Sequence, residues 1–417
     1  MSLEINGRKN STNIVVENEN YQSDTDWSIQ YIQKLLVILG VWSFVKQNPR
    51  KTELAFSIIR IITGVLLIAF VLIPLLIYLI TTKQNSTGKM KVFGPILLRV
   101  ANLMKCFFMI YRRNVIKFCF AHVKNDWKIA TSVSDHQIMK KNALNGRQIT
   151  LCCIVLMYIT ASFYQVILPF LRGKRIDAYN RTIRPFAYNV YDRFPSAQSS
   201  PQYEIIFYTT LVSAFITYTT TISSCGIAAT FVTHACGQIE ILMSRLNAIF
   251  DNFDDDLQLL NSRISTVVEL HVRILRLTDT IEEALSEIFF TEVMSSSFLL
   301  CSIGWRLTGQ WRTHDHVAFL TYSMYGVTIL YNLFIFCYIG ELLKGQCFRI
   351  GKVTYLIDWW KMPGKSGQAL ILLIAMANIP RPLTAGGIME LSVATFAAIV
   401  KTSVAYIRFV VSQDWSN

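Results

Sequence analysis

The sequence predicts an all-α membrane protein with seven transmembrane helices. Of its 417 residues, 52% are hydrophobic and 16% are charged, whereas a soluble domain usually carries nearer one quarter charged residues. The apolar residues gather in runs of the roughly 20 residues that a helix needs to cross a bilayer. The net charge of +13 lies between these runs, so an anionic inner leaflet explains it better than nucleic acid does.

Residues 1–54 are expected to lie in the cytosol, ahead of the first span. The first 25 residues are polar and resemble no signal peptide, which predicts a disordered tail. Residues 27–45 place apolar side chains close to helical spacing. This pattern predicts a short amphipathic helix along the inner face of the membrane.

Six apolar runs follow within residues 55–343. The predicted spans are residues 55–80, 90–111, 148–171, 204–233, 284–305 and 316–339. Arg99 and Lys105 interrupt the second run, and a charge inside a bilayer is costly unless it faces protein or water. We therefore expect this helix to face a protein interior or a water-filled cavity. Residues 234–283 and 341–365 are expected to form charged cytosolic connections.

The remaining residues, 344–417, hold that last connection and a final span. Residues 369–378 are apolar but too short to cross a membrane, and Pro380 and Pro382 stop any helix arriving from the N-terminal side. After Gly386 and Gly387, a new helix is predicted to run from Ile388 to Val411. Polar residues lie along it, so one side should face protein or water. Such a helix either lines a pore or packs inside the bundle.

The distribution of positive charge predicts the orientation. With a cytosolic N-terminus, the inner segments hold more than twice as many Lys and Arg residues as the outer ones. By the positive-inside rule the N-terminus is then cytosolic and, after seven spans, the C-terminus is extracellular. The glycosylation sequons at Asn85 and Asn180 both fall outside, where modification takes place.

The run of residues 383–407 carries a recognisable pattern: an Ala-Gly pair, Leu-Ser, Thr-Phe, then Lys-Thr-Ser and an aromatic. This pattern resembles the C-terminal signature of insect odorant receptors, and residues 26–44 are similar to the opening segment of that family. Val404 departs from the family, which usually has an aromatic there. The residues that carry the signature are Ala385, Gly386, Leu391, Ser392, Thr395, Phe396, Lys401, Thr402, Ser403 and Tyr406.

The resemblance implies a function, an assembly and a location. It implies the odour-binding subunit of a ligand-gated cation channel in the plasma membrane, with no cofactor. The partners would be a small volatile ligand and a shared co-receptor subunit in a heterotetramer. Residues 369–378 would be the cytosolic half of a broken helix 7, whose second half lines the pore. The alternatives are a gustatory receptor of the same superfamily or a metabotropic seven-helix receptor, although the motifs of G-protein-coupled receptors are absent.

The resemblance also places a ligand pocket in the outer half of the bundle, among helices 2 to 6. An apolar volatile needs aromatic walls and a few polar groups that fix its orientation. The alternative for each candidate is an ordinary contact between helices. The candidate ligand-binding residues are Phe93, Leu97, Tyr158, Ser162, Gln165, Tyr208, Tyr322 and Tyr325.

Three residues near the end of helix 7 are predicted to form the gate. Phe409 and Ser412 are three residues apart and share a helix face, with Tyr406 one turn further in. Apolar constrictions close pores by dewetting, and polar neighbours make an open state passable. Aligning Tyr406 with the helix 7 tyrosine of the family puts the other two at pore-facing positions. The alternative is that Phe409 packs against helix 5 or lipid.

The motifs of enzymes and metal sites are absent from the sequence. Gly364-Lys365-Ser366 imitates the end of a phosphate-binding loop, but Trp359 stands where the first glycine should be. None of the nine cysteines forms a CxxC pair, and the acidic run before Leu257 lacks the Gly and Glu of an EF-hand loop. We therefore expect neither an enzyme nor a metal site.

Overall fold

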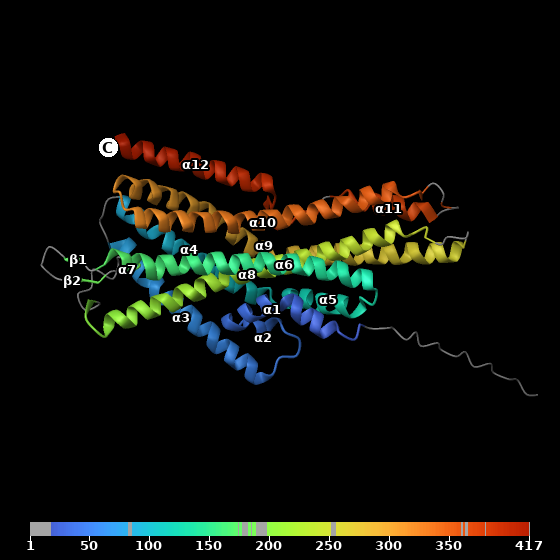
Figure 1. Ribbon diagram of the computed structural model, residues 1–417, viewed down its shortest axis with the longest axis horizontal. Helices are drawn as coiled ribbons and strands as arrows, with labels where there is room; N and C mark the ends of the chain where they lie inside the picture. Colours follow the sequence, from blue (N-terminus) through green and yellow to red (C-terminus); the bar gives the residue numbers. More distant parts are fainter. Residues whose placement is uncertain are drawn as a thin grey trace, which may run out of the picture.

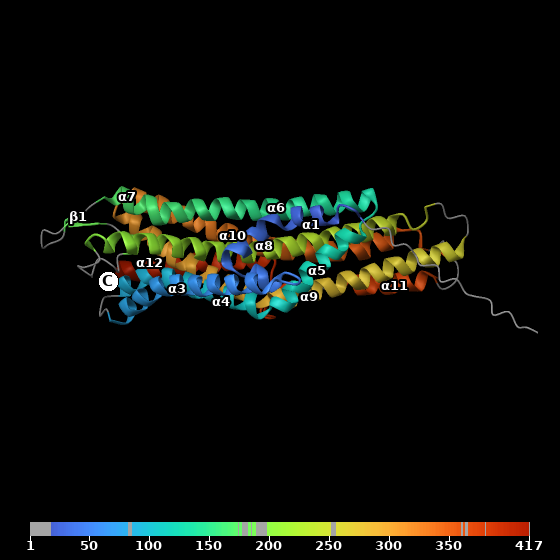
Figure 2. The same cartoon turned by 90° about the horizontal axis from the view of Figure 1, so that it is seen from below.

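The computed structural model describes residues 18–81, 86–173, 175–176, 182–184, 186–188, 198–251, 256–359, 362, 366–379 and 381–416. In this part of the chain, long helices run side by side along one axis (Figures 1 and 2). The helices are α1 (Tyr21–Leu39), α2 (Trp42–Val45), α3 (Lys51–Thr81), α4 (Ser86–Tyr111), α5 (Arg113–Ile129), α6 (Val133–Ser162), the π-helix η1 (Phe163–Ile167), α7 (Leu168–Arg172), α8 (Gln202–Asn247), α9 (Leu257–Arg312), α10 (His316–Leu356), α11 (Ser366–Ala377) and α12 (Val393–Ser416).

Strands play a small part in the described chain. Strand β1 (Arg175–Ile176) pairs antiparallel with β2 (Thr182–Ile183), and β3 (Thr384–Ala385) pairs with β4 (Met389–Glu390). The fold is therefore all-α, as the sequence predicts.

Six helical segments are long and apolar enough to cross a membrane, judged on the described residues by length and composition. They are α3, Val92–Tyr111 of α4, the continuous stretch Val133–Leu171, α8, α9 and α10. A seventh helix, α12, has 24 residues and follows the short apolar helix α11. This arrangement agrees with the prediction of six uninterrupted spans and a last span in two pieces.

The three central helices are much longer than a bilayer is thick. Helix α9 has 56 residues, which at 1.5 Å per residue is about 84 Å, against a hydrocarbon core of about 30 Å. Residues 234–283 and 341–365 were expected to be connections, but α8 continues to Asn247, α9 begins at Leu257, and α10 continues to Leu356. These extensions pack against α5 and α11, at the end of the bundle opposite to α7 and the end of α12 (Figure 1).

Helix α1 begins earlier than the sequence suggests. The disordered tail expected up to residue 25 is wrong from Tyr21 onwards, because the first turns are tied to neighbouring helices. The carboxylate of Asp24 accepts a hydrogen bond from the Asn18 side chain at 3.2 Å and lies 2.9 Å from Nε2 of His136. The apolar face of α1, including Leu36, is buried against α5, α6 and α8.

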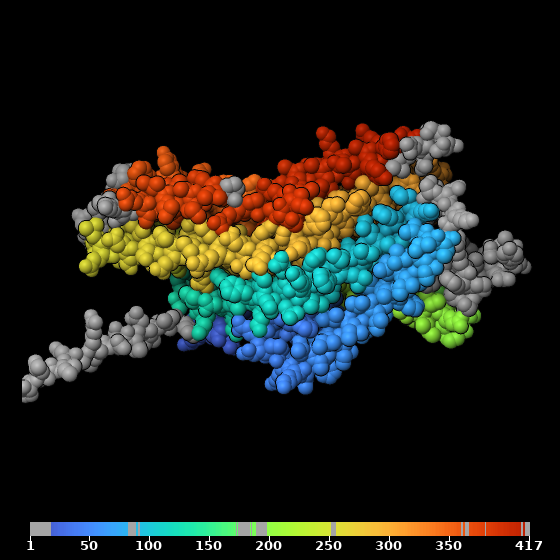
Figure 3. Space-filling view, turned by 180° about the vertical axis from the view of Figure 1, so that it is seen from behind, coloured from blue at the N-terminus to red at the C-terminus, as the bar shows by residue number. Residues whose placement is uncertain are grey.

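The last helix also begins later than expected. Gly386 and Gly387 have φ values of +65° and +72°, and they form the turn between β3 and β4 instead of starting a helix at Ile388. The helix α12 starts at Val393, where the Ser392 hydroxyl accepts a hydrogen bond from the Thr395 backbone N–H at 3.1 Å. From there α12 runs along one edge of the bundle, beside α9 and α10 (Figures 1 and 3).

Candidate functional site

A cavity lined mostly by buried residues, the inner cavity, lies among α4, η1, α8, α9 and α10, towards the end of the bundle that carries α7 and β1. It encloses about 30 Å³ that the centre of a water molecule can occupy, which is room for about two waters. The described residues that line it are Gly94, Pro95, Leu98, Arg99, Tyr164, Gln165, Tyr188, Ala214, Thr217, Tyr218, Leu299, Ser302, Ile303, Arg306, Tyr322 and Tyr325.

Tyrosine rings form much of the cavity wall. The ring of Tyr164 lies 6.0 Å from that of Tyr188, 6.1 Å from that of Tyr322 and 6.2 Å from that of Tyr325, measured between centroids. Rings at these separations pack through their edges and faces. The cavity is therefore mainly aromatic, with hydroxyl groups that can donate to or accept from a small polar ligand.

A π-helical turn brings two consecutive side chains into this wall. In η1 the backbone N–H of Leu168 bonds to the carbonyl of Phe163, five residues earlier. The extra residue per turn changes which side chains face inward, and such turns are frequent at functional sites. As a result, Tyr164 and Gln165 are both buried and both line the cavity.

Two arginines also line the cavity, and neither was among the predicted ligand-binding residues. Arg99 is only 2% exposed and donates to Ser213 Oγ at 2.7 Å, Thr217 Oγ1 at 3.3 Å and the Tyr188 hydroxyl at 3.2 Å. Arg306 donates to the Tyr322 hydroxyl, and its guanidinium lies 4.9 Å from the centre of that ring. The available signal for Arg99 was a charge within an apolar run.

The predicted ligand-binding residues fall in different places. Gln165, Tyr322 and Tyr325 line the cavity together. The Tyr158 hydroxyl bonds Thr219 at 2.8 Å, and the Ser162 hydroxyl donates back to the Tyr158 carbonyl, so both side chains are engaged outside the cavity.

The other three candidates on this list lie elsewhere. Tyr208 is 63% exposed on the surface of α8, and Leu97 packs against the apolar core. Phe93 lines a second, open crevice between α4, α9 and α12.

This crevice is larger than the inner cavity and mostly apolar. It offers about 730 Å³ on the same measure, and Ser302 lines both spaces. Of the three predicted gate residues, Tyr406 lines the crevice and is 48% exposed. Phe409 is 57% exposed, and the exposed Ser412 donates to the Phe409 carbonyl at 2.8 Å. The structure thus places all three on α12, along the edge of the bundle.

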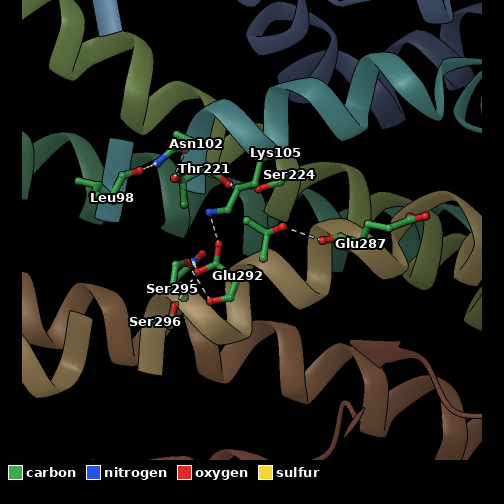
Figure 4. Close-up of polar contacts among 11 residues, drawn as sticks. Leu98, Asn102, Lys105, Thr221, Ser224, Glu287, Glu292, Ser295 and Ser296 are labelled. Carbon is green, nitrogen blue, oxygen red and sulfur yellow. Dashed lines mark hydrogen bonds and ion pairs between the residues drawn. The ribbon is translucent and has the colours of Figure 1, made fainter. Parts of the chain in front are cut away.

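A buried ion pair crosses the bundle beyond the cavity (Figure 4). Lys105 of α4 pairs with Glu292 of α9, and both side chains are nearly inaccessible to solvent. Glu292 also accepts hydrogen bonds from Ser296 at 2.8 Å and from Asn332 of α10 at 2.5 Å. The network therefore joins three helices, and the Lys105 charge has both a counter-ion and hydrogen-bonded neighbours.

A second polar cluster joins the helices away from the cavity. His122 Nδ1 and His234 Nε2 lie 3.0 and 2.8 Å from one carboxylate oxygen of Asp126, and Arg273 pairs with the other. These His and Asp ligand atoms lie within 4.8 Å of one another, as a metal site needs. The Arg273 guanidinium already compensates the charge of the Asp126 carboxylate. The cluster therefore needs no metal ion and connects α5, α8 and α9. Burial and the nearby Arg273 lower the pKa of His122 to about 4.

Comparison with known proteins identifies the family. A family model described as 7tm Odorant receptor matches residues 85–404, which is most of the chain. The chain belongs to the odorant receptor family. This receptor is 24% identical to odorant receptor 13a of Drosophila melanogaster over 61% of its own length, and 26% identical to odorant receptor 82a of the same species over 51%. It is also 21% identical to odorant receptor 10 of Aedes albopictus over 66%.

Solved structures show the same fold. The insect olfactory receptor OR5 from Machilis hrabei in complex with eugenol matches 94% of this receptor with a TM-score of 0.77 and 14% identity, and the match covers 100% of that chain. A second structure of the Machilis receptor matches 94% of this receptor and 99% of its own chain, with a TM-score of 0.75.

The family and the spans together describe a multi-pass receptor of the plasma membrane, and not an enzyme. The aligned regions cover 62% of the length of odorant receptor 13a and 54% of the length of odorant receptor 82a. The sequons at Asn85 and Asn180 lie outside the described residues.

Proposed function

We propose that this receptor is the odour-binding subunit of a heteromeric ligand-gated cation channel. A small volatile would bind in the inner cavity and open a pore lined by α12. The observation that carries the proposal is the cavity itself, because its tyrosine walls and few polar groups are what a small, mostly apolar ligand requires. The Machilis receptor with the same fold was solved in complex with eugenol, which supports a ligand of similar size and character.

Within this cavity we assign the ligand contacts to Gln165, Tyr322 and Tyr325. Because the free volume holds about two waters, a volatile of several carbons requires some tyrosine rings to rotate as it enters. Such ring movements against α9 and α10 offer a route to α12, which packs on those two helices. Ligand binding and pore opening would then be coupled through a short chain of contacts.

The pore-lining role of α12 is supported by its position and its composition. It lies at the edge of the bundle, where Lys401 is exposed, and Thr402 and Tyr406 are exposed where they line the open crevice. Polar and charged side chains facing lipid are unfavourable, so this surface is better suited to a water-filled pore shared with other subunits. A shared co-receptor subunit in a heterotetramer, as the family resemblance implies, would supply the rest of the pore.

The orientation that we propose places the N-terminus in the cytosol. The positive-inside rule supports it, and strands β1 and β2 lie at the same end of the bundle as the end of α12 (Figure 1). An epitope before Tyr21 should be stained only in permeabilised cells, and an epitope after Asn417 should be stained on intact cells. Staining of the N-terminal epitope on intact cells would show that the orientation is wrong.

Whole-cell recording tests the channel function. Cells that express this receptor together with a co-receptor subunit should conduct within milliseconds of odorant application while G-protein signalling is blocked. Cells that express the receptor alone should not conduct. A response that needs G proteins but no co-receptor would favour a metabotropic receptor instead, and a response to non-volatile tastants alone would favour a gustatory receptor.

A further inference from the structure

We propose that the inner cavity selects small carboxylic acids, and that the ligand carboxylate binds to the guanidinium of Arg99. This inference rests on the proposed function, since it names the chemical class of the ligand for the same cavity. It comes from three properties of Arg99: the charge of its surroundings, its unused hydrogen-bond donors, and its contrast with Lys105 on the same helix.

The charged side chains among the described lining residues are all basic. Arg99 and Arg306 are among the sixteen described residues that line it, and none of those sixteen is Asp or Glu. An ionised side chain buried at membrane depth is stabilised by an opposite charge, and without one it is costly. A ligand that brings its own negative charge would therefore bind more tightly here than a neutral ligand of the same size.

Arg99 has no carboxylate partner within the described chain. Its three hydrogen-bond acceptors are the hydroxyls of Ser213, Thr217 and Tyr188, which carry no charge. Lys105, six residues further along α4 and equally buried, pairs with the carboxylate of Glu292. The protein thus supplies a counter-ion for Lys105, whereas Arg99 has no counter-ion among the described residues.

Arg99 has unused hydrogen-bond donors. Two hydrogen bonds occupy Nη1 and one occupies Nη2, while Nε is buried without a hydrogen-bond partner in the described structure. A guanidinium has five N–H groups, so Nε–H and one N–H of Nη2 remain for a ligand. Charged N–H donors of arginine form strong hydrogen bonds with a carboxylate.

The rest of the cavity suits a short hydrocarbon chain on that carboxylate. Leu98, Leu299 and Ile303 supply aliphatic contacts, and the ring of Tyr218 faces the same space. The small free volume favours short-chain acids over long ones, because every added carbon requires further displacement of packed side chains. At neutral pH such acids are ionised, as ordinary carboxyl groups have pKa values near 4.

The test compares ligands that differ only in their polar group. Cells expressing the receptor and a co-receptor subunit would receive hexanoic acid, methyl hexanoate, hexanal and hexan-1-ol over the same concentration range. We expect the acid to be the most potent. Arg99→Met should raise the half-maximal concentration of the acid by about tenfold or more, since a hydrogen bond to a charged group contributes about 1.5–3 kcal/mol. The ester and the alcohol should change by less than about threefold by the same reasoning.

Two further variants keep the test decisive. Arg99→Lys retains the charge but not the planar fork, so the acid should lose part of its advantage over the ester. If Arg99→Met fails to reach the cell surface, this Lys variant still gives the ratio of acid to ester potency. Arg60→Met is the control, because Arg60 lies on α3, outside the cavity, and bonds the Val37 carbonyl at 2.8 Å. That ratio should not change in the control.

The outcomes separate this inference from the proposed function. If the ester or alcohol is more potent than the acid, or if the Arg99 variants shift all four ligands equally, the acid selectivity is wrong while odorant binding in the cavity stands. If no volatile of a broad panel produces a current, or if Tyr325→Ala leaves every odorant response unchanged, the proposed function itself fails, and this inference fails with it.

Discussion

Lys105 and Glu292 form an ion pair between α4 and α9 that is almost fully removed from solvent. Their side chains are 2% and 4% exposed, and Asn332 adds a hydrogen bond from α10. Taking two charges out of water is unfavourable, and the pair is tolerated because each charge compensates the other. Removing one of the two charges should therefore destabilise the fold more than removing both.

The first prediction follows from this asymmetry. Glu292→Gln leaves the Lys105 ammonium buried without a counter-ion, which should lower the free energy of unfolding by about 3–5 kcal/mol. The double variant Lys105→Met with Glu292→Met removes both charges and should recover most of that loss. Thermal unfolding in detergent, with surface labelling in cells, measures both effects.

The exposed pair between Lys46 and Glu53 provides the matched control. Its side chains are 42% and 37% exposed and 3.2 Å apart, so Lys46→Met should change stability by less than about 1 kcal/mol. If the double variant at 105 and 292 is as unstable as Glu292→Gln, the ion pair contributes through packing or its hydrogen bonds and not through charge compensation.

The second prediction concerns the tyrosine wall. Tyr322→Phe removes the hydroxyl that Arg306 bonds, and Tyr325→Ala removes a ring that packs against Tyr164. Each change should raise the half-maximal odorant concentration by about three- to thirtyfold, because a lost hydrogen bond or aromatic contact is worth roughly 0.5–2 kcal/mol. Dose–response curves normalised to surface expression provide the measurement.

Tyr208→Ala is the control for this wall. Tyr208 was also a candidate from the sequence, but its side chain is 63% exposed and does not line the cavity. Its removal should leave potency unchanged. A shift at Tyr208 as large as that at Tyr325 would mean that the ligand binds on the surface of α8 instead of in the cavity.

The sequence predicts the spans well but not the partners of buried charges. Arg99 and Lys105 are recognisable as costly charges in an apolar run, which correctly places α4 against protein. The partner of Lys105 lies 187 residues away in the sequence, and no local pattern selects it. Nor does any local pattern show that the hydrogen bonds of Arg99 in the described chain all go to hydroxyl groups, which is a property of the packed helices.

Helix geometry accounts for the other differences. Tyr158, Ser162 and Gln165 share a face on a regular α-helix, but the π-helical turn from Phe163 changes the direction of every later side chain. Hydropathy marks where α8, α9 and α10 are apolar, and it cannot show that they continue beyond the membrane. Their extensions form because α5 and α11 pack against them.

The third prediction concerns pH at the His122 cluster. The pKa of His122 is lowered to about 4 in the folded protein, against about 6.5 in an unfolded chain. The folded state therefore binds fewer protons between these values, so its stability is fully present above pH 6.5 and falls as the pH drops towards 4. The loss is at most about 1.4 kcal/mol per pH unit. Thermal unfolding in detergent across this range would detect it.

His122→Gln isolates this contribution. The amide can still donate to Asp126 but does not titrate, so the loss of stability between pH 6.5 and 4 should become smaller. His314→Gln, in the exposed turn before α10, should leave the profile unchanged. An identical profile for the wild type and His122→Gln would show that other groups set the acid sensitivity.

The fourth prediction concerns the proposed gate on α12. Phe409 and Ser412 are both exposed in the single chain, and they are three residues apart on one helix face, where neighbouring subunits would meet them. A bulky apolar ring in a narrow pore excludes water, so Phe409→Ala should raise the current in the absence of odorant or change the ion selectivity.

A cysteine at Ser412 tests whether the same face borders the ion path. A thiol-reactive cation applied from outside should alter the current of Ser412→Cys, and faster with odorant present, because an open pore admits the reagent more readily. Ser162→Cys is the control: Ser162 is exposed on α6, away from α12, so its modification should not depend on odorant. The wild-type receptor treated with the same reagent controls for the native thiols, including the exposed Cys152. If both α12 variants behave like the wild type while odorant still drives normal currents, the gate lies elsewhere on α12 or is formed by the partner subunits alone.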